Sequence, residues 1–132
     1  MRGFVLAAGF GTRLKPLTDH IPKALVPVCG IPLMERALGS FAAGGIADLA
    51  VNAHYRADQI CDFQRRSSCQ FRIFHEEGAI RGTGGAFAFA REFLAGDDSF
   101  AVWNADIVAD IDMNAISRRF LDSGAVAGLL SV

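Results

Sequence analysis

A short segment near the amino terminus, AAGFGTRLKPLTDHIPK (residues 7–23), combines glycines with an arginine and lysines. Glycine lets backbone N–H groups approach a ligand closely, and such loops often bind phosphate. Arg13 supplies a planar fork of donors that suits phosphate oxygens. Lys23, which follows Pro22, supplies a second and more point-like cation. We therefore interpret residues 9–23 as a loop that binds a phosphate-rich ligand.

Two common phosphate loops do not fit this segment. The P-loop requires GxxxxGK[ST], and the sequence contains no such string. The dinucleotide fingerprint GxGxxG has Leu14 in place of its third glycine. That fingerprint also expects an acidic residue after the next strand, where this chain has Asn52, Ala53 and His54. The sequence therefore argues against hydride transfer.

Apolar segments that alternate with amphipathic ones predict the elements that hold this loop. Buried or alternating runs predict strands at residues 3–8, 48–52, 70–75, 99–104 and 125–132. Helical periodicity predicts helices at residues 31–44, 57–66, 85–94 and 113–123, with Asp112 as the N-cap of the last one. Residues 76–85 are expected to form a glycine-rich loop, in which Glu76 and Glu77 are interpreted as a pair of loop charges.

Strands that alternate with helices predict right-handed βαβ units and a mostly parallel sheet covered on both faces. Ligands of such sheets bind beyond the carboxyl ends of the strands. The glycine loop follows the first predicted strand, and Asp106 follows the fourth. We therefore expect both to lie at the same edge of the sheet.

Composition narrows the class of protein. The chain has 132 residues, which is one domain at most, and its 52% hydrophobic content argues against disorder. A net charge of −1 gives no overall basic surface for nucleic acid. The apolar runs are too short and too interrupted to span a bilayer, so no membrane association is expected.

The side chains with other common uses have simpler interpretations. Cys29, Cys61 and Cys69 are odd in number and lack CxxC spacing, so we expect reduced, buried thiols in a cytoplasmic protein. The histidines are too far apart for a predicted metal site. Trp103 and the phenylalanines are expected in the core.

Beyond these local patterns, LAAGFGTRLKPLTDHIPKALVPVCGIPL resembles the signature of the sugar-1-phosphate nucleotidylyltransferases. GTGGAF (residues 82–87) is similar to the base-side glycine loop of that family, and NADIVADID (residues 104–112) to its strand-end metal segment. The resemblance covers nearly the whole chain. Two features look most like the bacterial mannose-1-phosphate guanylyltransferases or N-acetylmuramate-1-phosphate uridylyltransferases. These are the segment DLAVNAHYRADQI (residues 48–60) and the N-A-D form of the metal segment (residues 104–106).

The resemblance implies a Rossmann-like, three-layer α/β/α fold with a mostly parallel sheet. It also implies a reaction between a nucleoside triphosphate (GTP or UTP) and a sugar-1-phosphate. Arg13 and Lys23 would be the catalytic cations, and Asp106 would hold Mg²⁺, with Asp110 and Asp112 as alternatives. The residues expected to bind the nucleotide are Leu6, Ala8, Gly9, Gly11, Thr12, Arg13, Glu77, Gly82 and Thr83.

The resemblance also implies missing parts. Members usually have a second metal-binding aspartate and a sugar-binding part further along, so residues 1–132 would be the NTP-binding portion. We expect weak nucleotide binding, little turnover and a tendency to self-associate through uncovered surfaces. Two alternatives stay open: a non-catalytic relative that senses nucleotides, and cytidylyl transfer to a non-sugar phosphate such as phosphocholine.

Overall fold

A parallel sheet of four strands organises the chain, and a computed structural model describes residues 1–131. The strands are β1 (Arg2–Leu6), β4 (Leu49–Ala53), β5 (Arg72–His75) and β6 (Phe100–Asn104). Their order is β5-β4-β1-β6, and every neighbouring pair is parallel. All four carboxyl ends therefore meet at one edge, as the sequence predicts.

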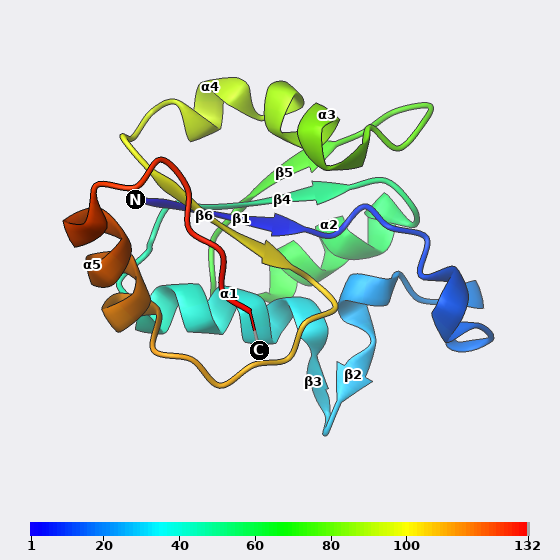
Figure 1. Cartoon of the computed structure of the whole chain (residues 1–132). Coiled ribbons are helices and arrows are strands. Elements are labelled where there is room, and N and C mark those ends of the chain that lie inside the picture. The colour runs from blue at the N-terminus through cyan, green and yellow to red at the C-terminus, as the bar shows by residue number, and fades with distance from the viewer. Residues whose placement is uncertain (132) are drawn as a thin grey trace.

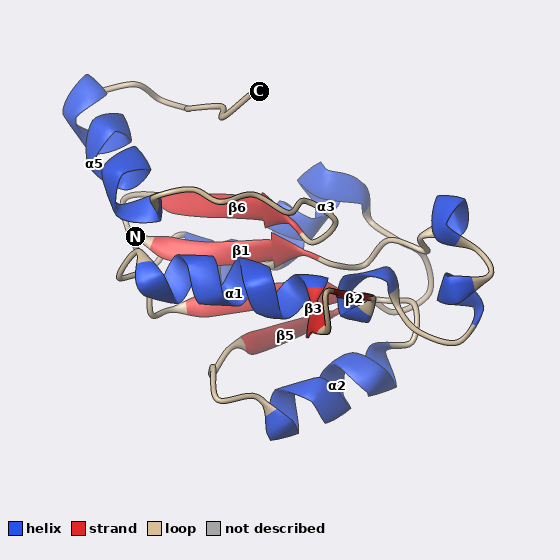
Figure 2. Cartoon of the chain, turned by 90° about the horizontal axis from the view of Figure 1, so that it is seen from below, coloured by secondary structure: helices blue, strands red, loops and turns tan. Residues whose placement is uncertain are grey.

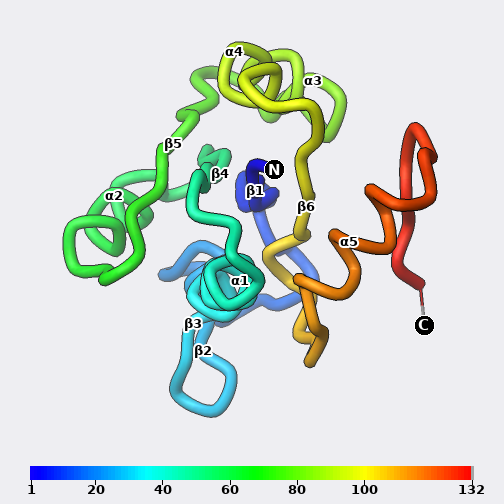
Figure 3. Tube along the Cα trace, turned by 90° about the vertical axis from the view of Figure 1, so that its left-hand side faces the viewer, coloured from blue at the N-terminus to red at the C-terminus, as the bar shows by residue number. Residues whose placement is uncertain are grey.

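Helices cover both faces of this sheet, which confirms the three-layer α/β/α arrangement. Helices α1 (Leu33–Ala43) and α2 (Ala57–Arg66) lie on one face, and α3 (Gly82–Phe89) and α4 (Arg91–Leu94) lie on the other (Figures 1 and 3). Helix α5 (Met113–Ser123) lies beside β6 and α1 at the end of the sheet (Figure 2).

The central strand β1 supplies both halves of the core. Phe4 is fully buried against α3 and α4, where it packs with Ala86, Ala90 and Phe93. Its neighbour Val5 is also fully buried, on the opposite face beneath α1 and α2. A strand that is buried on both faces needs a continuous apolar run, which explains the sequence GFVL.

The proline-rich segment after β1 folds into short 3₁₀ turns rather than a regular helix. These are η1 (Thr12–Leu14), η2 (Leu17–Asp19) and η3 (Lys23–Leu25), followed by the small hairpin of β2 (Pro27–Val28) and β3 (Ile31–Pro32). Proline lacks a backbone N–H and fixes φ, so the turns stay short. The chain thereby returns to the sheet edge from which it departed.

The glycine-rich loop is shorter than the sequence predicts. The sequence pattern predicts a helix from residue 85, whereas α3 already begins at Gly82, and Ala90 separates it from α4. Glycine disfavours helix by about 1 kcal/mol per residue. Burial of Ala86 and Ala90 against the sheet compensates for this cost, so tertiary packing overrides the local preference.

The prediction of a fifth strand over residues 125–132 is wrong for the described part of that segment. Residues 125–131 form no strand and are exposed, with Leu129 at 93% and Val126 fully accessible. This segment pairs with no strand of the sheet, although β6 is an edge strand, so its local β preference is not realised. Val132 lies outside the described residues.

Two groups of side chains are less buried than the sequence predicts. Cys29 is exposed at the tip of the β2–β3 hairpin, while Cys61 and Cys69 are partly buried; all are free thiols. Three phenylalanines are exposed by 40% or more: Phe10, Phe89 and Phe100. Trp103 is buried as expected.

Helix α5 provides a test of the predicted N-cap. The Asp112 carboxylate accepts a hydrogen bond of 3.0 Å from the backbone N–H of Ala115. We expect Asp112→Ala to lower the free energy of unfolding by about 1 kcal/mol, measured by urea denaturation. Asp110→Ala, which removes an exposed aspartate before the helix, is the matched control and should change stability little. Equal effects of the two substitutions would contradict the capping role.

Candidate functional site

The glycine loop after β1 (residues 9–23) leaves the sheet at the end of that strand and becomes exposed at once. Ala7 and Ala8 are still buried, and Gly9 is exposed. The backbone N–H of Ala7 donates to Asn52 Oδ1 at 2.7 Å, which ties the start of the loop to the end of β4. The loop therefore starts from a fixed point on the sheet and continues toward solvent.

Gly11 allows the loop to close on itself. Its φ is +65°, and a Cβ atom at this position would lie 2.8 Å from Lys23 Cβ and 2.9 Å from Thr18 Cγ2. The buried Thr18 hydroxyl donates to the Gly11 carbonyl at 2.8 Å. Only glycine fits both the left-handed conformation and the close approach. Gly11 thus brings the Lys23 segment against the phosphate loop.

Lys23 and Asp106 meet across the carboxyl edge of the sheet. Lys23 Nζ forms a hydrogen-bonded ion pair with Asp106 Oδ2. Asp106 is held from both sides: the Ala105 N–H donates to the Leu6 carbonyl at 3.1 Å, and the Trp103 indole donates to the Ile107 carbonyl at 3.0 Å. The two residues predicted for catalysis and for metal binding are therefore in direct contact.

Electrostatics place Arg13 in the same neighbourhood. Desolvation by itself would raise the pKa of the Asp106 carboxyl, but the hydrogen bond and charge of Lys23, with the charge of Arg13, lower the net pKa below its ordinary value. Arg13 lies in η1 and is exposed. Within residues 1–131 its side chain forms no ion pair, so its guanidinium is available to an anion.

The predicted base-side residues lie at the start of α3. Gly82 has a φ of +67° and begins the helix, and Thr83 follows it; both are exposed. No side chain caps this end of α3. Glu77 is exposed in the preceding loop. The first turn therefore presents backbone N–H groups beside a carboxylate, at the same sheet edge as the phosphate loop (Figure 1).

Sequence reasoning missed the role of Glu76. It is fully buried and accepts hydrogen bonds of 2.8 Å from Asn52 Nδ2 and from the Arg81 N–H, so it does not form the simple loop charge pair with Glu77 that the sequence predicts. His54 Nδ1 also lies 2.7 Å from the Glu76 backbone oxygen. The available signal was a polar residue near the end of one strand, Asn52 in LAVNA, and another directly after the next strand, Glu76 in RIFHE.

The two alternative metal ligands, Asp110 and Asp112, lie outside the contact between Lys23 and Asp106. Asp112 caps α5, and Asp110 is exposed in the segment before it. Within the described part of the chain, no three histidine, cysteine, aspartate or glutamate side chains are grouped so as to hold a metal ion.

No helix of residues 1–131 is long and apolar enough to cross a membrane.

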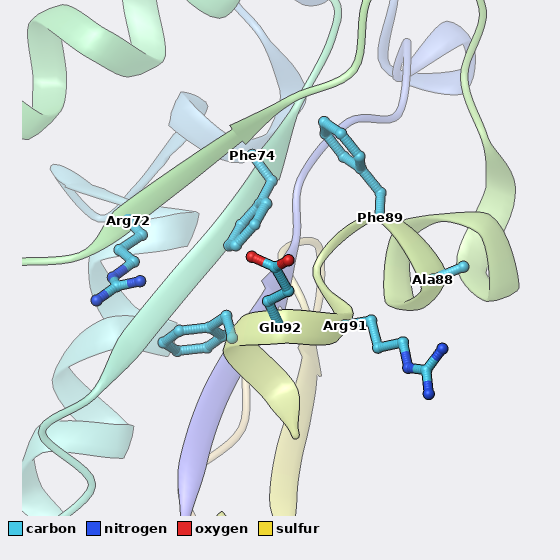
Figure 4. A pocket seen from close by; sticks show the side chains of 7 residues that line it. Arg72, Phe74, Ala88, Phe89, Arg91 and Glu92 are labelled. Atoms are coloured by element: carbon cyan, nitrogen blue, oxygen red, sulfur yellow. The ribbon is translucent and has the colours of Figure 1, made fainter. Parts of the chain in front are cut away.

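A pocket of about 530 Å³ lies elsewhere, between β5 and helices α3 and α4. Its lining residues are Arg72, Phe74, Ala88, Phe89, Arg91, Glu92 and Phe93 (Figure 4). None of these residues belongs to the predicted nucleotide or metal set. We assign the candidate site to the sheet edge rather than to this pocket, because the cations, the carboxylate and the free glycine backbone are gathered there.

Curated proteins of similar sequence include mannose-1-phosphate guanyltransferases. The chain is 36% identical to a mannose-1-phosphate guanyltransferase of Aspergillus fumigatus and 33% identical to that of Emericella nidulans. Each match covers 96% of this chain but only 36% of the relative. The chain thus spans about a third of the length of these relatives, which are fungal.

Solved structures share the fold. A putative glucose-1-phosphate thymidylyltransferase from Bacillus anthracis superposes with a TM-score of 0.83 at 23% identity, over 94% of this chain and 51% of that one. An apo UDP-glucose pyrophosphorylase gives 0.74 at 22% identity, over 93% and 55%. The family model described as nucleotidyl transferase matches residues 2–132. With the match extending over almost the entire chain, this protein belongs to the nucleotidyl transferase family.

Proposed function

We propose that this chain is the nucleotide-binding part of a nucleotidylyltransferase that transfers an NMP from an NTP to a sugar-1-phosphate, releasing pyrophosphate. The observation that carries the proposal is the contact between Lys23 and Asp106 beside the glycine loop, at the sheet edge where the charge of Arg13 also lowers the pKa of the Asp106 carboxyl. The names of the curated relatives favour GTP and mannose-1-phosphate, with UTP and another sugar-1-phosphate as the alternative.

The reaction requires two anions to approach each other. An oxygen of the sugar-1-phosphate attacks the α-phosphorus of the NTP, and pyrophosphate leaves. No covalent enzyme intermediate is needed, so the protein contributes position and charge. Arg13, which is exposed and unpaired among the described residues, would stabilise charge on the leaving pyrophosphate. Lys23 would contact the α-phosphate between the two substrates.

Asp106 has the chemistry to hold Mg²⁺. Its carboxylate side chain is 41% exposed, and carboxylate oxygen is a ligand that this hard cation prefers. Mg²⁺ is commonly bound by one or two carboxylates together with phosphate oxygens, so a single aspartate fits when the nucleotide supplies further ligands. The metal would neutralise phosphate charge. Asp106 would then exchange its contact with Lys23, which frees the ammonium for the α-phosphate.

We further propose that residues 1–131 hold the NTP and that sugar recognition requires additional chain. This follows from the length of the relatives, of which the chain spans 36%. The cysteines are free, which is consistent with a reducing compartment, and we place the reaction in the cytoplasm.

The decisive experiment is a matrix of NTPs against sugar-1-phosphates, read by pyrophosphate release in the presence of Mg²⁺. It compares the 132-residue chain with a protein that extends this chain to the length of its relatives. We expect nucleotide binding by both and turnover by the longer protein. A longer protein that binds NDP-sugar but turns over no pair would favour a nucleotide sensor instead. Equal turnover by both would contradict the division into two parts.

Loss of either cation should affect the reaction more than the fold. In the longer protein, we expect Arg13→Ala and Lys23→Ala each to lower the rate of pyrophosphate release about 100-fold or more, because each removes positive charge from a preorganised site. Lys15→Ala is the matched control, since exposed Lys15 lies in the same loop and pairs with Asp19 at 3.3 Å. A rate for Lys15→Ala as low as that for Arg13→Ala would show that only general positive charge matters.

Gly11→Ala should separate the loop from Lys23. The new methyl group would collide with Lys23 and Thr18, and the φ of +65° would be strained. We expect nucleotide affinity, measured by isothermal titration calorimetry, to fall about 10-fold or more. Gly30→Ala is the control, because Gly30 has a φ of +77° but a methyl group there would have no atom within 4 Å. It should lower stability through strain without changing affinity.

A further inference from the structure

A buried chain of hydrogen bonds joins the two glycine loops of the site. The Ala7 N–H donates to Asn52 Oδ1 at 2.7 Å, and Asn52 Nδ2 donates to Glu76 Oε1 at 2.8 Å. The Arg81 N–H donates to Glu76 Oε2 at 2.8 Å. Asn52 is 4% exposed and Glu76 is fully buried. We call Asn52 and Glu76, with the two backbone amides they hold, the loop clasp.

Each end of the loop clasp lies where a nucleotide loop begins. Ala7 is the second residue before Gly9, and Arg81 directly precedes Gly82, the first residue of α3. The middle of the clasp is anchored in the sheet, since Asn52 lies in β4 and the Glu76 N–H donates to the Ala53 carbonyl at 2.8 Å. The phosphate-side and base-side loops are thus attached to one rigid support.

The loop clasp leaves the next amides available. Within residues 1–131, the backbone N–H groups of Gly9 and Gly11 donate to no backbone acceptor, and α3 has no side-chain cap at its start. The clasp therefore satisfies one amide at the beginning of each loop and fixes the direction of the unpaired amides that follow. Such fixed donors are suited to phosphate and base oxygens.

A buried carboxylate at position 76 is unfavourable for the stability of the fold. Both Glu76 oxygens are hydrogen-bonded, but in the part of the chain that the structure describes no lysine or arginine forms an ion pair with them. Burying a charged group without a cation is unfavourable unless every lone pair finds a donor. A carboxylate is, however, a compact group that accepts from two directions at once, which the two loops require.

We propose that Asn52 and Glu76 are positioning residues that set the separation of the phosphate-side and base-side loops, and thereby the affinity for the nucleoside triphosphate. The inference rests on the proposed function. Neither side chain is required to touch the nucleotide. Their effect reaches it through the backbone of Gly9–Gly11 on one side and Gly82–Thr83 on the other.

Exchanging the two side-chain types provides a direct test. Asn52→Asp places two carboxylates face to face. Glu76→Gln gives position 76 only one oxygen, so its amide NH₂ must face one of the two donors there, the Asn52 amide or the Arg81 N–H. In the double variant N52D/E76Q, the carboxylate introduced at position 52 would accept from both the Ala7 N–H and the amide NH₂ introduced at position 76. The carbonyl oxygen of that same amide would accept from the Arg81 N–H. Every donor again has an acceptor, so the double variant should restore the loop clasp.

The experiment measures two quantities on the wild type, both single variants and the double variant. The first is the dissociation constant for Mg·GTP and Mg·UTP by isothermal titration calorimetry. The second is hydrogen exchange of the Ala7 and Arg81 amides by NMR, without nucleotide. We expect each single substitution to weaken binding about 10-fold or more and to speed exchange at both amides, and the double variant to recover most of both.

A matched control separates positioning from general stability. Ile60→Val removes a buried methyl group on α2, away from the loop clasp, and should lower the melting temperature without changing the dissociation constant. If the single variants lower the melting temperature but bind nucleotide like the wild type, the positioning role is wrong. The positioning role is also wrong if the double variant binds nucleotide no better than the single variants. If a single variant does not fold, a double variant that also fails to bind nucleotide contradicts the positioning role in the same way.

Failure of the proposed function would look different. In that case the wild type itself would bind neither nucleotide, and the positioning role for a nucleotide would be rejected together with the proposed function. Amide exchange at Ala7 and Arg81 would still report whether Asn52 and Glu76 hold the two loops.

Discussion

The parallel pairing of β1 with β4 and β6 is the constraint on which the rest of the site depends. Because these strands run in the same direction, the segments that follow them emerge at one edge of the sheet. The glycine loop, Asn52 and Asp106 come from distant parts of the sequence and meet there. The two faces of β1 are buried beneath different helix pairs, so this central strand has no freedom to change register without exposing core residues.

Lys23 and Asp106 neutralise each other in the unliganded site, which leaves the charge of Arg13 unpaired among the described residues. Lys23 pairs with Asp106, while Arg13 lies nearby and contributes to the lowered pKa of the Asp106 carboxyl. A triphosphate with Mg²⁺ brings both signs of charge, so it can offer Lys23 an anion and Asp106 a cation in exchange for their mutual contact. The ion pair is partly exposed and of modest strength, which makes this exchange energetically accessible.

Local patterns predict most elements because local forces determine them. Helix α2 has the predicted bounds, and the Asp112 cap depends only on a residue three positions further along. The family signature identifies Arg13, Lys23 and Asp106 as candidates, and the structure brings Lys23 and Asp106 into contact. The predictions fail where distant contacts decide. Gly82–Gly85 are helical because of packing against the sheet, and residues 125–131 pair with no strand, although β6 is an edge strand.

Glu76 is the clearest case in which a contact between residues far apart in the sequence decides the role of a side chain. Its charge suggests exposure, and only the fold reveals that Asn52, 24 positions earlier, donates to it in the interior. An apolar side chain would fill this space without desolvating a charge, but it would leave the Asn52 amide and the Arg81 N–H without acceptors. The carboxylate satisfies both donors with one group. Glu76 holds the Arg81 amide directly and the Ala7 amide through Asn52, so two loops that are separated in sequence are joined by these two side chains.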